Sequence, residues 1–215
     1  MKRVAMLLAL ATGDFGSNKR KRQVRTLPRF SSVTLNGLGT VHLHQGPQEV
    51  VITMDERLFD LFVTEVKGRV LHMGFSHWSL LRSLWFLFQT DKGRIDITLP
   101  EIEAVNVNGK GTVLSDPLTA ESLEVALHGA SSITLQGNVS KLRIVSTGAA
   151  RFEGRHLVAE RCSVKMNGSG RIEIEAKEKL NASVIGAGKL VYWGEPKVTV
   201  KTTGASTVKK GEDRK

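Results

Sequence analysis

Two histidines, His42 and His44, alternate with Leu43 in the segment VHLHQ and come nearest, among the residues of this chain, to the spacing of a metal site. Side chains two positions apart in a β-strand point to the same side, so both imidazoles would face outward together. A closed zinc site takes about four ligands, and no third ligand lies nearby in the sequence. The pattern predicts two solvated histidines, with no bound metal and no other cofactor.

Glu173 and Glu175 alternate in the same way behind Arg171. Two carboxylates can act as acid and base on a glycosidic bond when they face each other across a cleft, but no cleft residue accompanies this pair. Cys162 is the single cysteine, so no intramolecular disulfide can form, and its apolar phase predicts a small buried side chain. We therefore predict no catalytic residue. A carbohydrate-active β-helix lyase or hydrolase acting on an envelope or host polysaccharide is the alternative.

The spacing of Gly168 and Gly170 in MNGSGRIEIEA is similar to that in a phosphate-binding loop, but in such a loop a helix follows the glycines. Here an alternating strand pattern follows instead. The pair belongs to a series of glycines spaced 18 to 20 residues apart, and a similar stretch upstream is centred on Gly37. These glycines are expected to be structural corner residues: Gly37, Gly109, Gly129, Gly148, Gly168, Gly186 and Gly204.

The segments around these glycines must position every candidate side chain. Apolar residues recur at every second position before each glycine and again four residues after it, from Leu123, Val125 and Leu127 to Val198 and Val200. Alternation of this kind is typical of strands that bury one face, and a single unit of this size cannot cover its own apolar side. We predict an all-β protein, a right-handed β-helix-like β-solenoid of stacked coils of about 19 residues with glycine at the corners.

Charge and the termini define the expected organisation. The net charge is +10, but residues 1–29 hold eight Lys/Arg against one acid, and residues 209–215 hold four against two. The remaining body is nearly neutral, which argues against a nucleic-acid partner. Residues 1–11 have the layout of a signal peptide. We expect cleavage there, a basic disordered leader over 12–29, one β-solenoid domain over 30–208 and a charged tail over 209–215. The protein would be exported to the periplasm, cell envelope or surface, or would be cytoplasmic if the signal does not function.

The segment 75–90 is the most apolar part of the chain after the signal, and it breaks the two-residue alternation. It is too short for a transmembrane helix, which needs about twenty residues. It could cover an open side or end of the solenoid, or it could form a partner, homo-oligomer or membrane contact. The residues that would make such a contact are Trp78, Trp85, Phe86 and Phe88.

These features together resemble the head GIN domain family of putative auto-transporter adhesins. The matching stretches are FSSVTLNGLGTVHLHQG, DERLFDLFVTEVKGRVLHM, IDITLPEIEAVNVNGKG and the glycine-anchored coils that follow. The resemblance implies an exported bacterial protein with a β-helix-like fold. It implies no established activity, and it supplies no catalytic motif to transfer.

The function predicted from these observations is an exported binding or adhesion module without catalytic activity. Stacked coils present rows of outward side chains, and such rows could contact an extended glycan or an envelope or surface protein. The outward residues expected to contribute are Arg143, Lys165, Arg171, Lys189 and Lys201, with Thr199, Thr203, Tyr192 and Trp193.

Overall fold

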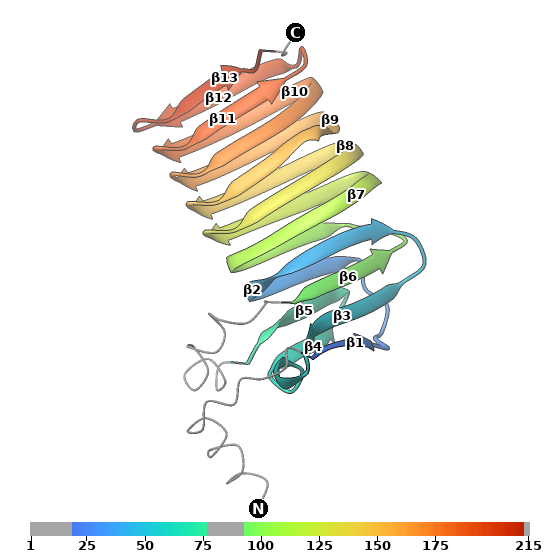
Figure 1. Cartoon of the computed structure of the whole chain (residues 1–215). Coiled ribbons are helices and arrows are strands. Elements are labelled where there is room, and N and C mark those ends of the chain that lie inside the picture. The colour runs from blue at the N-terminus through green and yellow to red at the C-terminus, as the bar shows by residue number, and fades with distance from the viewer. Residues whose placement is uncertain (1–18, 77–92, 213–215) are drawn as a thin grey trace, which may run out of the picture.

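The computed structural model describes residues 19–76 and 93–212, and its main body is a stack of bent strands that run side by side (Figure 1). The strands are β7 (Ala104–Gly129), β8 (Ser132–Gly148), β9 (Arg151–Gly168) and β10 (Arg171–Gly186). Each pairs with the next in parallel. The predicted β-solenoid is confirmed.

Each coil has two sheet faces separated by the corner glycine. We call the pre-glycine face the one formed by the segments that precede these glycines, 104–108, 122–128, 141–147, 161–167, 179–185 and 197–203, and the post-glycine face the one formed by 112–116, 132–136, 151–154, 171–176, 189–193 and 207–210. At the second corner the ladders shift register, for example between Thr134 and Gln136. Parallel pairing keeps the faces aligned, so equivalent side chains lie in rows along the stack.

The interior between the two faces is filled by the alternating apolar residues. The residues before the glycines, from Leu123 to Val184, and those four positions after them, such as Phe152 and Ile172, are buried. Cys162 lies in this interior, and its burial raises the pKa of the thiol to about 12. The predicted inward phase is correct through β10.

The corner glycines form a column because neighbouring backbones approach closely there. All seven predicted corner glycines have a positive φ, and Gly168 lies in register with Gly148 of the preceding coil. A Cβ on Gly168, where φ is +140°, would lie 2.1 Å from the carbonyl oxygen of Gly148. Gly170 has no positive φ, but a Cβ there would lie 2.3 Å from the oxygen of Ala150. Glycine is therefore required at position 170 because a Cβ would not fit there, and not because of the backbone φ.

The N-terminal end carries an insertion between two consecutive coils. β2 (Ser32–Gln45) pairs along one edge with β7, where Gly37 lies opposite Gly109. Its other edge pairs with β5 (Val70–Phe75) and β6 (Arg94–Leu99). The insertion also contains β3 (Glu49–Asp55), the 3-10 helix η1 (Glu56–Leu58) and β4 (Phe62–Lys67). The buried Asp55 caps η1 by accepting hydrogen bonds from the backbone and guanidinium of Arg57.

The expected disordered leader over 12–29 is wrong at residues 20–24. They form β1 (Arg20–Val24), which pairs antiparallel with β3. The segment RKRQV has no apolar alternation because β1 is an edge strand held by backbone hydrogen bonds and largely exposed. Charged residues are typical of edge strands, since they oppose pairing with another chain.

The prediction that Val198 and Val200 are buried is also wrong. They belong to β12 (Lys197–Thr203), which pairs with β10, while β11 (Lys189–Trp193) also pairs with β10 and is followed by β13 (Thr207–Lys210). Val198 and Val200 remain 37% and 36% exposed. Their phase is inward, but no further coil of the described chain covers them.

Several predictions fall outside the described residues. These include the signal peptide at 1–11 and the contact residues Trp78, Trp85, Phe86 and Phe88. Within residues 19–76 and 93–212, no helix has the length and apolar character needed to cross a membrane.

Candidate functional site

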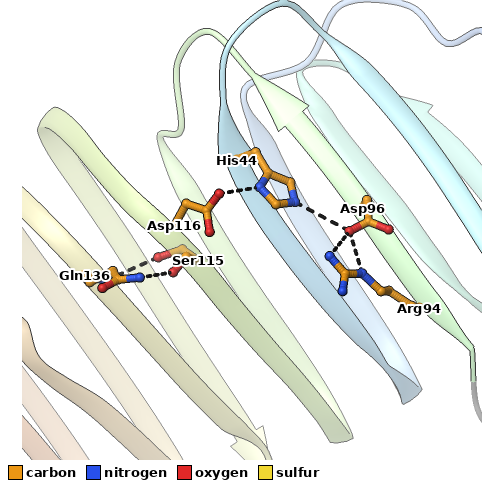
Figure 2. A network of polar contacts seen from close by, with 6 residues as sticks. All are labelled: His44, Arg94, Asp96, Ser115, Asp116 and Gln136. Carbon is orange, nitrogen blue, oxygen red and sulfur yellow. Dashed lines mark hydrogen bonds and ion pairs between the residues drawn. The ribbon is translucent and has the colours of Figure 1, made fainter.

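A polar network surrounds His44 on the post-glycine side of the stack, where β2 lies between β6 and β7 (Figure 2). Nδ1 of His44 lies 2.7 Å from Oδ2 of Asp116, and Nε2 lies 3.5 Å from Oδ1 of Asp96. The Nε of Arg94 donates to the same Asp96 oxygen at 2.7 Å. The network therefore joins three neighbouring strands. Asp116 lies on β7, His44 on β2, and Asp96 and Arg94 on β6.

The imidazole of His44 lies between two carboxylates and not beside a nucleophile. Nδ1 faces Asp116 and Nε2 faces Asp96. The nearby Ser115 Oγ instead accepts a hydrogen bond from the backbone N–H of Gln136 at 3.3 Å. Neither ring nitrogen of His44 is thus linked to a nucleophile in Figure 2.

The two histidines are partly solvated, since both residues are of intermediate exposure and 30% of the His44 side chain is exposed. Burial, with the positive charge of Arg94 as the second cause, lowers the pKa of His42 below its ordinary value. Within the described residues, no group of three or more His, Cys, Asp or Glu side chains is placed to hold a metal ion.

Glu173, one of the two carboxylates considered for acid–base chemistry, belongs to a row of short-range ion pairs on the post-glycine face. Arg171 donates to Glu173 at 2.6 Å, and Arg151 and Glu153 form the equivalent contact one coil earlier at 3.4 Å. Arg94 and Asp96 have the same two-residue spacing. Because each arginine here has an acid two positions on, this part of the post-glycine face is charge-balanced.

The pre-glycine face has a different electrostatic character in its C-terminal part. Lys141, Arg143 and Arg161 pair with glutamates at 3.7, 3.4 and 3.2 Å. Four further exposed lysines of this face have no ion pair with any described residue: Lys165 on β9, Lys179 on β10, and Lys197 and Lys201 on β12. We call these four residues the lysine patch.

The lysine patch is ordered by strand register. Lys179 lies directly opposite Lys197 on the next coil, and Lys165 and Lys201 lie in one row on either side of Ser183. Neighbouring coils are about 4.8 Å apart, so the second pair is about 10 Å apart. Small polar side chains occupy the adjoining positions: Ser163, Asn167, Asn181, Ser183, Thr199 and Thr203.

The row of outward residues expected from the sequence is divided between the two faces. Arg143, Lys165, Lys201, Thr199 and Thr203 lie on the pre-glycine face, whereas Arg171, Lys189 and Trp193 lie on the post-glycine face. The expected outward position of Tyr192 is wrong, because Tyr192 is in register with the buried Ile174 and packs against the core. The guanidinium of Arg155 stacks 5.0 Å from the Trp193 ring. A single ligand lying flat on one face could not contact both sets.

Lys179 and Lys197 were missed as candidate residues, although the sequence contained a signal for them. Counting charge over the whole body gives near neutrality, because acids elsewhere, many of them in the insertion, such as Glu49, Glu56 and Asp60, offset the unpaired lysines. Assigning each charged residue to a coil and a face by its distance from the corner glycine separates these lysines from those acids.

The fold and the site together define a class of protein: a β-solenoid with flat, solvent-exposed faces. The chain belongs to the family described as "Putative auto-transporter adhesin, head GIN domain", whose model matches residues 29–196. A search of curated proteins found no match to this chain.

Solved structures of similar fold include proteins from Bacteroides fragilis and Parabacteroides distasonis. A putative adhesin from Bacteroides fragilis superposes with a TM-score of 0.69 at 19% identity, covering 90% of this chain and 98% of that one. A putative adhesin from Parabacteroides distasonis gives 0.59 at 20% identity, covering 91% and 98%. A putative lipid binding protein from the same species gives 0.54 at 18% identity, covering 92% and 98%. At these identities the likeness establishes the fold.

Proposed function

We propose that this protein is an exported cell-envelope or surface binding module, without catalytic activity, whose lysine patch binds an extended anionic glycan. The observation that carries the proposal is the set of four exposed lysines on one flat face, each without a carboxylate partner in the described residues. Family membership supports the adhesive role, since the family is described as putative adhesins.

The composition of the patch favours a glycan over other polyanions. Repeating carboxylate or phosphate groups on a polysaccharide can meet lysines that recur at the spacing of the coils. Hydroxyl groups of the sugars can exchange hydrogen bonds with the small side chains between them, such as Asn181, Ser183 and Thr199. The lysine patch and the small polar residues between its lysines include no aromatic ring, whereas single-stranded nucleic acids bind through stacking on aromatic side chains.

The binding half of the proposal is tested with the full chain and two polysaccharides, acidic polygalacturonate and neutral dextran. The Lys165→Ser/Lys179→Ser double variant should weaken polygalacturonate binding about tenfold, because each exposed ion pair contributes up to about 1 kcal/mol. Lys110→Ser is the matched control, since Lys110 is an exposed lysine outside the patch. Equal binding of dextran, or equal loss in the control, contradicts the proposed ligand class.

The export half is tested by fractionating native cells and sequencing the N-terminus of the protein recovered. The proposal expects a mature chain that begins at Thr12 in the periplasmic, envelope or surface fraction. An intact Met1 on protein confined to the cytoplasm would contradict export.

A further inference from the structure

The C-terminal end of the described solenoid is a sheet edge above a hollow lined by both apolar and polar side chains. β12 and β13 each pair on one side with the preceding coil, and no further described strand pairs with them. In Figure 1 they lie at the extreme end of the stack, opposite β1. The hollow has a volume of about 420 Å³ and is lined by Tyr192, Val198, Val200, Thr202, Ser206 and Val208.

This end has the chemical features of a strand-docking site. A parallel strand added beyond β12 would complete the next coil, and its inward side chains would cover Val198 and Val200. Backbone hydrogen bonds to an exposed sheet edge provide affinity in β-strand addition, and alternate side chains provide specificity. A strand docked at the free edge of β12 would pair with β12 in the same way that β12 pairs with β10.

Charge determines which strand fits. Lys197 and Lys201 lie outward on β12, and Lys209 lies on β13; none of the three has an ion pair with a described residue. Lysines on an edge strand oppose its pairing with another strand. Acidic side chains directly opposite these lysines stabilise the pair instead.

A second copy of the chain is a poor occupant of this edge. Pairing two C-terminal ends would bring the lysines of β12 together. Stacking the C-terminal end on the N-terminal end of another copy would place β13, which carries Lys209, against β1, which carries Arg20, Lys21 and Arg22, because both strands lie on the post-glycine side. It would place β12 against β4, where Glu65 is already paired with Lys67. Both arrangements bring like charges together, which is destabilising across a strand pair.

We propose that the edge of β12 docks an extended segment of a partner protein in which acidic and apolar residues alternate. The register places an acid opposite Lys197 and another opposite Lys201, with apolar residues opposite Val198 and Val200 and a small polar residue opposite Thr199. This site shares Lys197 and Lys201 with the lysine patch, but it differs from the glycan proposal in requiring the sheet edge and the hollow.

The test measures binding of the full chain to a short fluorescent peptide in which glutamate alternates with valine and threonine in this pattern. Lys201→Glu should weaken binding about fivefold or more, because it replaces an opposite-charge pair with a like-charge pair. Lys165→Glu is the matched control: it makes the same charge change in the same row, two coils away from the edge. Val200→Asp should also abolish binding, and its melting temperature reports whether the terminal coil still folds.

The possible outcomes separate the alternatives. Binding that is lost in Lys201→Glu and Val200→Asp, is retained in Lys165→Glu, and is absent for a peptide with proline at the central position supports strand docking. Equal loss in Lys165→Glu, or equal binding of the proline peptide, shows only general electrostatic attraction and overturns the proposal. Absence of peptide binding, or self-association of the chain that Lys201→Glu alters, overturns the choice of partner. None of these results depends on whether polygalacturonate binds.

Discussion

Replacing Gly168 with alanine tests the physical reason for the glycine column, and Gly37 provides a matched comparison. Both glycines have a positive φ, +140° at Gly168 and +95° at Gly37. A Cβ on Gly168 would lie 2.1 Å from the carbonyl oxygen of Gly148, whereas a Cβ on Gly37 would meet no atom within 4 Å. The two substitutions therefore share backbone strain, but only one adds a collision with the neighbouring coil.

The expected magnitudes follow from these two terms. A non-glycine residue held at positive φ costs about 1–2 kcal/mol, so Gly37→Ala should lower the free energy of unfolding by about that amount. Relieving an overlap of this size requires a shift of β9 relative to β8, and such overpacking costs about 1–3 kcal/mol more. Gly168→Ala should therefore cost about 2–5 kcal/mol in total.

The assay is thermal unfolding followed by circular dichroism, with urea unfolding as a second measure. For a chain of this size, 1 kcal/mol corresponds to about 2–4 °C in the melting temperature. Gly168→Ala should then melt about 5 °C below Gly37→Ala. If the two variants melt together, close approach between coils is not what requires glycine at this corner, and our explanation of the column is refuted.

Three further predictions concern the core, the thiol of Cys162 and the partly buried His42. Ile172→Asp should destabilise the protein by more than about 4 kcal/mol because it buries an unpaired charge, while Glu173→Lys on the exposed side should cost much less; equal melting temperatures would show the assigned phase to be wrong. Cys162 should not react with Ellman's reagent in the native protein, because burial raises its pKa to about 12 and excludes the reagent; rapid native labelling would contradict this. The pKa of His42 is lowered, so folding favours its neutral form: the contribution to stability is present above the ordinary value of about 6.5 and is lost as the pH falls through the lowered pKa. His42→Gln should reduce this acid-side loss in a pH series of urea unfolding, and an unchanged slope would contradict the assignment.

The coil repeat could be predicted because its causes are local. Glycine at a corner such as Gly129 answers a backbone requirement, and alternation around Ile144 or Val164 reports burial directly. The same rule failed at Val200, because burial there depends on whether another coil follows. It also missed β1, whose backbone hydrogen bonds to β3 leave no apolar pattern in the sequence.

The candidate sites were less predictable because their residues come together across the insertion. His44 meets Asp96 and Asp116, which lie 52 and 72 residues away in the chain. β6 and β7 lie on either side of β2. This arrangement can be predicted only once the insertion between Gly37 and Gly109 is recognised. The lysine patch is a different case, since register alone aligns Lys179 with Lys197 once the coils are known.

Lysine footprinting of the intact protein tests the central claim most directly, because it shows where an acidic polysaccharide lies. The full chain is acetylated with and without polygalacturonate, and the modification of each lysine is measured by mass spectrometry. We predict protection of the lysine patch, most clearly at Lys165 and Lys179, with unchanged modification of Lys110 and of Lys209 on the post-glycine side. Uniform protection of all lysines, or protection of Lys110 and Lys209 with the patch still reactive, would contradict the account.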